Sequence, residues 1–539
     1  MSGTGKPNRH APQAPHCDLN TKREGGSRVI LRGDKVEIGN PGLNQCHPFH
    51  AKNYSTGPAT ASHRRSTASR GRWRCAPTNM QRDLNALANQ TFDLMVIEGG
   101  IHGAATAREA VLRGLKVALV AARDFSSGTS SRSSKLIHGG LCYLEQLDFK
   151  LVHESRTERR LLLSLAPHLA RPVPFLLPIY RGDPYYPLKI RVGPSIHDLL
   201  GNLGPEDRHR MLTAEEALNL IPALRSEGLR AAAIYHDSET DDARLTLENI
   251  IDAAEHGAVV ANYTEIRALA LSAKGKVREV VSAEAEDGLT GRRYEISACF
   301  WVNATGPWVD RLRGVLPGFE GQKTLRLTKG THLILPPVAP RHALFAAILP
   351  GERGFLLLPW YDHALLGTTG TDFEGDPASV QPERADVHYL LRAVNRVLRQ
   401  PLQADDVLGS FAGLRALATE PGRSPSENTR AYCFHEEVET KNFISICGGK
   451  LTTARALGEK LVEEISERLG THSVRRLSSR AMPLPGWTHR ALRPVREVGN
   501  GTSRSGVWRA VAHCGAHRAD LWKPLAAGAR SHPQIDVGR

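Results

Sequence analysis

Residues 92–121 read FDLMVIEGGIHGAATAREAVLRGLKVALVA, and this stretch decides the fold. A continuous apolar run at 92–97 is followed by a helical pattern from Gly103 to Gly114 and by a second apolar run at 116–121. Two short buried strands on either side of one helix form a βαβ unit with parallel strands and a right-handed crossover. The sequence therefore predicts an α/β fold with a Rossmann-like domain.

The turn between the first strand and the helix has glycines at 99, 100 and 103. Glu98 stands where the G-x-G-x-x-G pattern of dinucleotide-binding proteins has its first glycine. Such glycines let the backbone approach a pyrophosphate at a helix N-terminus. An ordinary tight turn is the structural alternative, so the motif alone leaves both interpretations open.

The composition excludes few classes of protein. The 539 residues are 41% hydrophobic, which suits a large enzyme or a large binding protein. The net charge is +14, but residues 1–80 hold 13 Lys and Arg against 4 Asp and Glu, and residues 485–539 hold 9 against 3. The interval between these tails is close to neutral, so we expect no nucleic-acid partner.

The eight cysteines form no C-x-x-C pair and no cluster with histidine, which argues against a zinc site and a disulfide scaffold. No apolar run reaches the 18 residues or so of a membrane span, so any membrane contact is expected to be peripheral. Residues 1–79 lack a hydrophobic period and are predicted to be a disordered basic tail; the acid-free stretch 52–80 also resembles a transit peptide.

Strand and helix patterns continue along the chain. Residues 241–257 are predicted to form a helix with acids at its start, and the chain then becomes rich in strand signals typical of an antiparallel sheet. A helix is predicted at 382–400, a buried strand ending in two glycines at 443–449, and a long amphipathic helix at 450–470. Residues 485–539 lack a period and are predicted to be an irregular basic tail.

Residues 124–169 begin DFSSGTSSRSSKLIHGGLCYLE and resemble, almost throughout, the FAD-dependent glycerol-3-phosphate dehydrogenases that pass electrons to quinone. Further motifs match the same family in the same order: DDARL (241–245), VNATGPWVD (302–310), RLTKGTH (326–332), GTTGTDFEGDP (367–377), FAGLRAL (411–417) and GGKLTT (448–453). The resemblance covers about 80–484. Several ordered motifs make it far more specific than one glycine turn.

The resemblance implies a Rossmann-like FAD-binding domain with a parallel sheet and a substrate domain with an antiparallel sheet. The FAD-binding domain is expected in three segments, 80–175, 241–312 and 405–484, and the substrate domain in two, 176–240 and 313–404. The implied activity is oxidation of sn-glycerol 3-phosphate to dihydroxyacetone phosphate, with hydride transfer to FAD N5 and electrons passed to quinone. A cytoplasmic protein on the inner face of the cell membrane, with a homodimer as a candidate assembly, is also implied.

The resemblance also assigns site residues. Arg415 and Lys450 are expected to bind the substrate phosphate, because fixed cations suit a dianion. Arg430 is a further candidate for the same phosphate, and His332 and Tyr143 are candidates at the catalytic site. The expected cofactor-binding residues are Gly99, Gly100, Gly103, Thr129, Ser130, Ser133, Ser134, Lys135, His138, Gly139, Ala304, Gly306, Gly449, Lys450, Leu451 and Thr452. The base that takes the hydroxyl proton stays open between His138 and His332, and no metal is expected.

The family pattern is altered at Glu98, His102, Ala121, Cys142 and Gly370. A carboxylate about 4 Å from a phosphate is repelled by about 4 kcal/mol at an effective dielectric near 20, unless it turns away or is protonated. Ala121 removes the acid expected at a ribose hydroxyl, and Asp124 is an imperfect substitute. Cys142 replaces an arginine expected at the phosphate.

Two other functions stay open at this point. A non-catalytic remnant of the family would account for the altered positions, whereas the retained Arg415 and Lys450 favour an enzyme. An amine or amino-acid oxidase on a similar flavin scaffold would not account for the motif SSKLIHGGLCYLE.

Overall fold

The computed structural model describes residues 80–139, 149–183, 209–274, 277–319, 321, 323–346, 354–419, 432–437, 440–471 and 477–486. All of the described residues belong to one compact unit of the chain. Among these described residues, no helix is long and apolar enough to cross a membrane.

The predicted βαβ unit is present. After α1 (Leu84–Asn89), β1 (Thr91–Ile97) leads through a turn into α2 (Ile101–Leu112), and β2 (Val117–Val120) returns parallel to β1. Strand β1 is buried almost throughout because both of its faces are covered, as its continuous apolar sequence requires.

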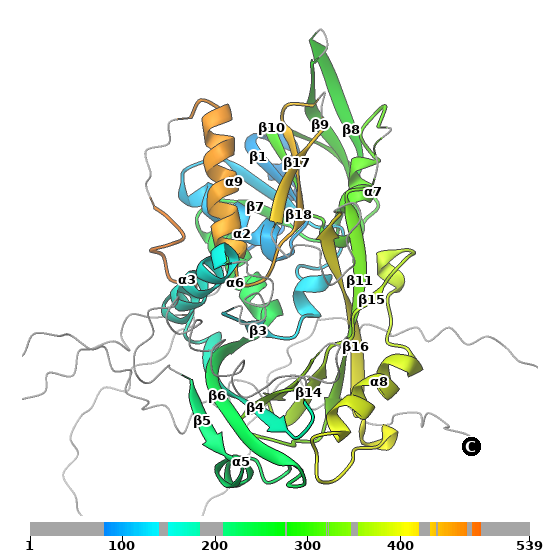
Figure 1. Ribbon diagram of the computed structural model, residues 1–539. Coiled ribbons are helices and arrows are strands. Elements are labelled where there is room, and N and C mark those ends of the chain that lie inside the picture. The colour runs from blue at the N-terminus through cyan, green and yellow to red at the C-terminus, as the bar shows by residue number, and fades with distance from the viewer. Residues whose placement is uncertain are drawn as a thin grey trace, which may run out of the picture. The chain divides into compact units, whose positions relative to one another are not determined.

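In the first sheet β1 lies beside β10 (Figure 1), and β2 pairs with its other edge. The strand order of this sheet is β17 (Tyr432–Glu436), β18 (Phe443–Gly448), β10 (Arg293–Asn303), β1, β2 and β7 (Val259–Ala261). From β18 to β7 these neighbours are parallel, and β17 is antiparallel to β18. A hairpin of β8 (Thr264–Lys274) and β9 (Val277–Asp287) pairs with the first half of β10.

Helices cover one face of this sheet. Alanines of α2 pack with apolar residues of α6 (Asp242–Glu255) and α9 (Ala454–Arg468) against Leu94 and Val96 of β1. The other face is closed by the β8–β9 hairpin, which packs on Met95 and Trp301. Helix α3 (Phe149–Leu165) lies beside α9, to which the buried Glu158–Arg455 ion pair joins it.

The second sheet is mostly antiparallel. Its strand order is β15 (Thr371–Asp372), β11 (Leu325–Leu335), β14 (His363–Gly367), β13 (Phe355–Trp360), β12 (Ala343–Ala346), β4 (Ala170–Tyr180), β6 (Leu229–Thr240) and β3 (Leu136–Ile137). In addition, β16 (Gly409–Ala418) pairs with β11 along most of its length, and β5 (Arg210–Thr213) pairs with β6. The pair β12–β4 is parallel.

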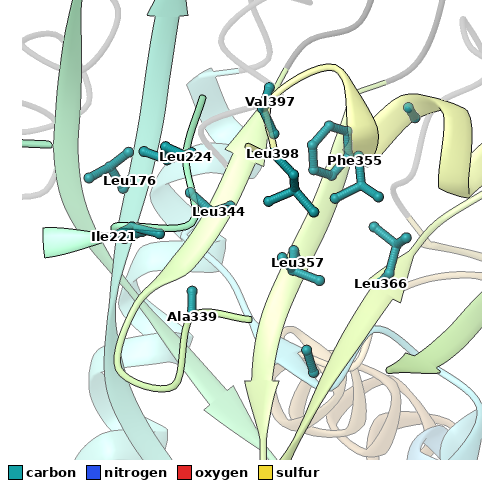
Figure 2. Packing of buried hydrophobic residues seen from close by; sticks show 14 of the residues in the cluster. Leu176, Ile221, Leu224, Ala339, Leu344, Phe355, Leu357, Leu366, Val397 and Leu398 are labelled. Atoms are coloured by element: carbon teal, nitrogen blue, oxygen red, sulfur yellow. The ribbon is translucent and has the colours of Figure 1, made fainter. Parts of the chain in front are cut away.

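The core of the second sheet lies under α8 (Arg384–Asn395) and α5 (Ala214–Leu220). Figure 2 shows strand residues such as Leu344 and Leu366 meeting Leu224, Val397 and Leu398 from the connecting segments. The remaining short elements are α7 (Val309–Arg313) and the 3-10 turns Thr129–Ser131, Gly306–Trp308, Pro377–Ser379 and Ala404–Asp406.

The predicted fold class is confirmed, with a Rossmann-like parallel sheet and a second, antiparallel layer. The four segment boundaries proposed between the two domains stay predictions. The helix predicted over 450–470 begins only at Ala454, because the chain first leaves two left-handed glycines, Gly448 and Gly449, through a turn. The helix predicted from Gly103 begins two residues earlier, at Ile101.

The contact between α2 and α9 depends on a glycine, which gives a test of the packing. A Cβ at Gly458 would lie 2.9 Å from the backbone carbonyl of Ala105, closer than side chains normally approach. We expect Gly458→Ala to lower the free energy of unfolding by about 1–3 kcal/mol, because the two helices must move apart. Urea denaturation measures this change, with the exposed α9 substitution Glu467→Ala as the control that stays within about 0.5 kcal/mol. Equal stability of both variants would contradict the close approach.

Candidate functional site

The carboxyl ends of the parallel strands meet at one edge of the first sheet. Strands β1, β2, β10 and β18 end at Ile97, Val120, Asn303 and Gly448. Ligands of open α/β sheets bind outside this edge. The side chain of the buried Asn303 links β10 to its neighbours at this edge. Its Nδ2 donates to Ser445 Oγ of β18 at 3.0 Å, and its Oδ1 accepts from Thr305 Oγ1 at 2.6 Å.

The turn after β1 brings the start of α2 close to this edge. A Cβ at Gly103 would lie 2.0 Å from the carbonyl oxygen of Glu98, so this position requires glycine. The Ile101 N–H at the start of α2 donates to Ser130 Oγ at 2.9 Å. Backbone N–H groups and the positive end of the helix dipole therefore converge where a pyrophosphate would bind.

Glu98 takes a conformation that favours glycine, with φ of +89°. Its Oε1 accepts a hydrogen bond of 2.8 Å from the backbone N–H of Ala122, just beyond the end of β2. Burial raises the pKa of Glu98, and the N–H groups of Ala122 and Gly99 and the charge of Arg123 oppose that increase. The Glu98 carboxylate is therefore bound beside the end of β2. This orientation turns the side chain away from the helix N-terminus and reduces its repulsion of a phosphate bound there.

A second glycine turn follows β18. Gly448 and Gly449 have φ of +76° and +91°, and a Cβ at Gly449 would lie 2.6 Å from Cε1 of His102. Lys450 Nζ donates to Ser155 Oγ of α3 at 3.2 Å. The predicted residues Leu451 and Thr452 complete this turn before α9.

His102 lies between the two glycine turns. Its Nε2 is 3.4 Å from the carbonyl oxygen of Lys450. Burial lowers the pKa of His102 to about 4, and the Lys450 carbonyl opposes that shift only in part. A neutral imidazole therefore fills the space between α2 and the turn at Gly449.

The end of β10 closes the same group of turns. Ala304 N–H donates to the carbonyl oxygen of Ile97 at 3.0 Å, and the Ala304 Cβ would be 3.3 Å from a Cβ at Gly103. Gly306, with φ of +56°, then turns the chain into the 3-10 segment. The structure therefore brings three predicted groups together at this edge: the residues at 99–103, 304–306 and 449–452.

The hydroxyl-rich loop 127–135 joins this edge to the second sheet. Ser130 binds α2, whereas Thr129 Oγ1 donates to the carbonyl oxygen of Leu414 in β16 at 2.7 Å. A Cβ at Gly413 would lie 2.5 Å from the carbonyl oxygen of Arg132, so the loop lies directly on β16.

Asp242, at the start of α6, holds the end of this loop. Ser133 Oγ donates to Asp242 Oδ2 at 2.6 Å, and Lys135 Nζ donates to Asp242 Oδ1 at 2.6 Å and to the Ser131 carbonyl at 2.6 Å. From the sequence, the acids of DDARL are predicted only to lie at the start of a helix. Asp241 does cap the helix at Arg244, whereas Asp242 reaches across to the loop, which only the tertiary contact reveals.

The Arg415 side chain, on β16, lies beside β11 and the end of β14. Arg415 donates from Nη2 to Thr368 Oγ1 at 2.9 Å and from Nη1 to the Thr369 carbonyl at 3.2 Å. A Cβ at Gly330 would lie 2.6 Å from Arg415 Nη2, so a glycine provides the space for the guanidinium. Gly370, one of the altered positions, directly follows these threonines, and nothing in the structure explains that change.

His332 is buried beside this arginine. Its Nε2 is 2.8 Å from Ser134 Oγ, its ring stacks on Phe411, and Nδ1 has no hydrogen-bond partner among the described residues. Burial, together with the charges of Arg415 and Lys135, lowers the pKa of His332 to about 3. The imidazole is therefore neutral at physiological pH.

Other predicted residues lie elsewhere. His138 and Gly139 follow β3, where the Gly139 N–H donates to Asp237 Oδ1 at 2.9 Å. Burial raises the pKa of Asp237 to about 6, opposed by Arg159 and by that N–H group. Cys142, Tyr143 and Arg430 lie outside the described residues.

A glycine-lined strand edge at a helix N-terminus, joined by one loop to the partly buried Arg415 and the buried His332, is the arrangement expected of a dinucleotide-binding enzyme. The family model for FAD dependent oxidoreductases matches residues 93–464. With relatives more than 30% identical over most of its length, the chain belongs to the FAD-dependent glycerol-3-phosphate dehydrogenases of that family. Its cofactor is therefore FAD, and the close-approach glycines and helix N-terminus at the strand edge fit that molecule.

Three comparisons support this assignment. The chain is 35% identical over 419 residues to a glycerol-3-phosphate dehydrogenase of Synechocystis sp., covering 75% of each protein. It is 36% identical over 418 residues to the aerobic glycerol-3-phosphate dehydrogenase of Bacillus subtilis, covering 76% of this chain and 74% of that protein. The structure of the Bacillus halodurans glycerol-3-phosphate dehydrogenase with FAD matches at 33% identity and a TM-score of 0.58, over 74% of this chain and 69% of that one.

The buried His332 predicts a pH dependence of stability. The pKa of His332 is 6.5 in the unfolded chain and about 3 in the folded protein. Between these values the unfolded chain binds a proton and the folded protein does not, so the free energy of unfolding falls as the pH falls. For this one group the decrease is about 1.4 kcal/mol per pH unit. Urea denaturation from pH 6.5 to 4.5 should therefore give a smaller slope for His332→Gln than for the unmodified protein. The exposed His388→Gln is the control, and an equal slope in all three proteins would show that His332 titrates normally.

Proposed function

We propose that this protein oxidises sn-glycerol 3-phosphate to dihydroxyacetone phosphate. The observation that carries the proposal is the loop 127–135, which contacts the start of α2 through Ser130 and His332 through Ser134. One segment thus joins the cofactor edge to the part of the second sheet that carries Arg415 and the neutral His332. When bound, FAD supplies the flavin N5 that accepts the hydride from substrate C2.

Arg415 is proposed to bind the substrate phosphate. Its guanidinium donates to the oxygens of Thr368, Thr369 and Lys329, and these contacts orient the group. A planar guanidinium suits bidentate contact with a phosphate dianion. Lys450, Arg430 and Tyr143 are proposed as further phosphate and substrate contacts on the family resemblance.

His332 is proposed to accept the proton of the C2 hydroxyl. Its neutral ring offers a nitrogen lone pair in a buried pocket, and Ser134 fixes the ring through Nε2. The charges of Arg415 and Lys135 lower its basicity. A phosphate dianion bound at Arg415 would offset that charge and raise the basicity when substrate is present.

Ser133, Lys135 and Asp242 are proposed to keep the loop in the shape that this chemistry needs. Their mutual hydrogen bonds hold the backbone between Ser130 and Ser134. Ser130 and the N–H groups at 99–103 and 449–452 are proposed to contact the cofactor directly.

The proposal extends to the electron acceptor and the location. Quinone as acceptor, peripheral contact with the inner face of the cell membrane from the cytoplasmic side, and a homodimer all follow from the family resemblance. The name of the Bacillus subtilis relative, an aerobic dehydrogenase, supports an acceptor used in aerobic metabolism.

The reaction can be followed in the visible spectrum of the purified full chain. We expect a bound-flavin band that bleaches when sn-glycerol 3-phosphate is added without oxygen, because the substrate hydride reduces the flavin. Glycerol, which lacks the phosphate, is the control and should leave the band unchanged at the same concentration. A bound flavin that substrate does not bleach would contradict the proposed activity.

The proposed role of Arg415 has its own test. We expect Arg415→Ala to raise the KM for sn-glycerol 3-phosphate by about 100-fold or more, because a charged contact to the phosphate is lost. The FAD content should stay unchanged. Arg326→Ala is the matched control on the neighbouring strand, since Arg326 is bound to Asp372 at the surface. An unchanged KM in Arg415→Ala would assign phosphate binding to other residues.

A further inference from the structure

Glu98 and the end of β2 are neighbours across the first sheet. Strands β1 and β2 are parallel, and Ile97 pairs with Val120, so the residues that follow these two also lie side by side. The Glu98 side chain spans this gap and reaches the backbone N–H of Ala122 at 2.8 Å. A side chain that begins on β1 therefore delivers its carboxylate to the end of β2.

The end of β2 is where dinucleotide-binding proteins hold the acid that binds the ribose hydroxyls of the adenosine half. Ala121 has no polar side chain there. Asp124 lies four residues beyond β2, and its Oδ1 accepts from Phe125 N and from Asn262 Nδ2, each at 2.9 Å. Glu98 is bound closer to the strand end, at the backbone N–H of Ala122.

We propose that Glu98 binds the ribose hydroxyls of the adenosine half of FAD and replaces, from β1, the acid that β2 lacks. A carboxylate has about four lone-pair sites, so it can accept from ribose hydroxyls as well as from backbone N–H groups. The left-handed backbone at Glu98 would suit glycine better, and a functional carboxylate accounts for a side chain at that place.

The same geometry leaves the pyrophosphate region intact. In this pattern the first glycine serves the tight turn, whereas the second allows the close approach of the pyrophosphate and the third allows helix packing. Gly100 and Gly103 keep the second and third places. Of the three glycine positions, 98 is thus the one where a side chain interferes least with the phosphates.

The test measures the binding of ADP and of 2′,3′-dideoxy-ADP to the full chain freed of flavin. These probes share the adenine and pyrophosphate but differ in both ribose hydroxyls. We expect the unmodified protein to bind ADP about tenfold or more tightly than the dideoxy analogue, as for a hydrogen bond to a charged group. In Glu98→Gly, which suits the left-handed backbone, this ratio should fall to about one.

Two further variants complete the design. Glu98→Gly combined with Ala121→Glu returns the acid to β2 and should restore the ratio, and Asp124→Asn should leave the ratio unchanged. Thermal melting of each variant confirms that it is folded.

The proposal is overturned if Glu98→Gly keeps the ratio, if it binds both probes more tightly by the same factor, or if Asp124→Asn abolishes the ratio. No binding of ADP by the unmodified chain would also overturn it. None of these outcomes bears on the proposed substrate, which is tested by flavin bleaching.

Discussion

The contact between Gly103 and the carbonyl oxygen of Glu98 is the constraint on which the rest of the site depends. It brings the first turn of α2 against the end of β1, so that the helix N–H groups open toward the strand edge. Ser130 then caps this helix start, and the loop that carries Ser130 continues to the second sheet. Any larger residue at 103 would move the helix and, with it, the support of that loop.

The loop 127–135 couples two layers that have different physical character. The first sheet is buried on both faces and offers backbone groups at its edge, whereas the second offers side chains, notably Arg415 and His332. Asp242 balances the charge of Lys135 inside this loop, so the cation is buried without being unpaired. Arg415 and the neutral His332 lie in the same sheet because their strands, β16 and β11, are paired along most of their length.

The altered positions differ in their consequences. Glu98 is accommodated by its hydrogen bond to Ala122. His102 is accommodated as a neutral ring between two glycine turns, which explains how a large side chain fits there. These two substitutions are therefore compatible with the fold of the cofactor edge, and the family assignment does not require the usual residues at either place.

Sequence patterns alone determined the βαβ unit, the strand that ends in two glycines and the two-layer class, because hydrophobic period and glycine position report local geometry. Ordered motifs also nominated Arg415, Lys450 and Ser130 as candidate site residues. Only the tertiary structure decided what each residue contacts: Asp242 with Lys135, Ser134 with His332, and Glu98 with Ala122. These pairs are distant in the chain or cross between neighbouring strands. Their contacts depend on the sheet register and on the path of one loop, which no local pattern encodes.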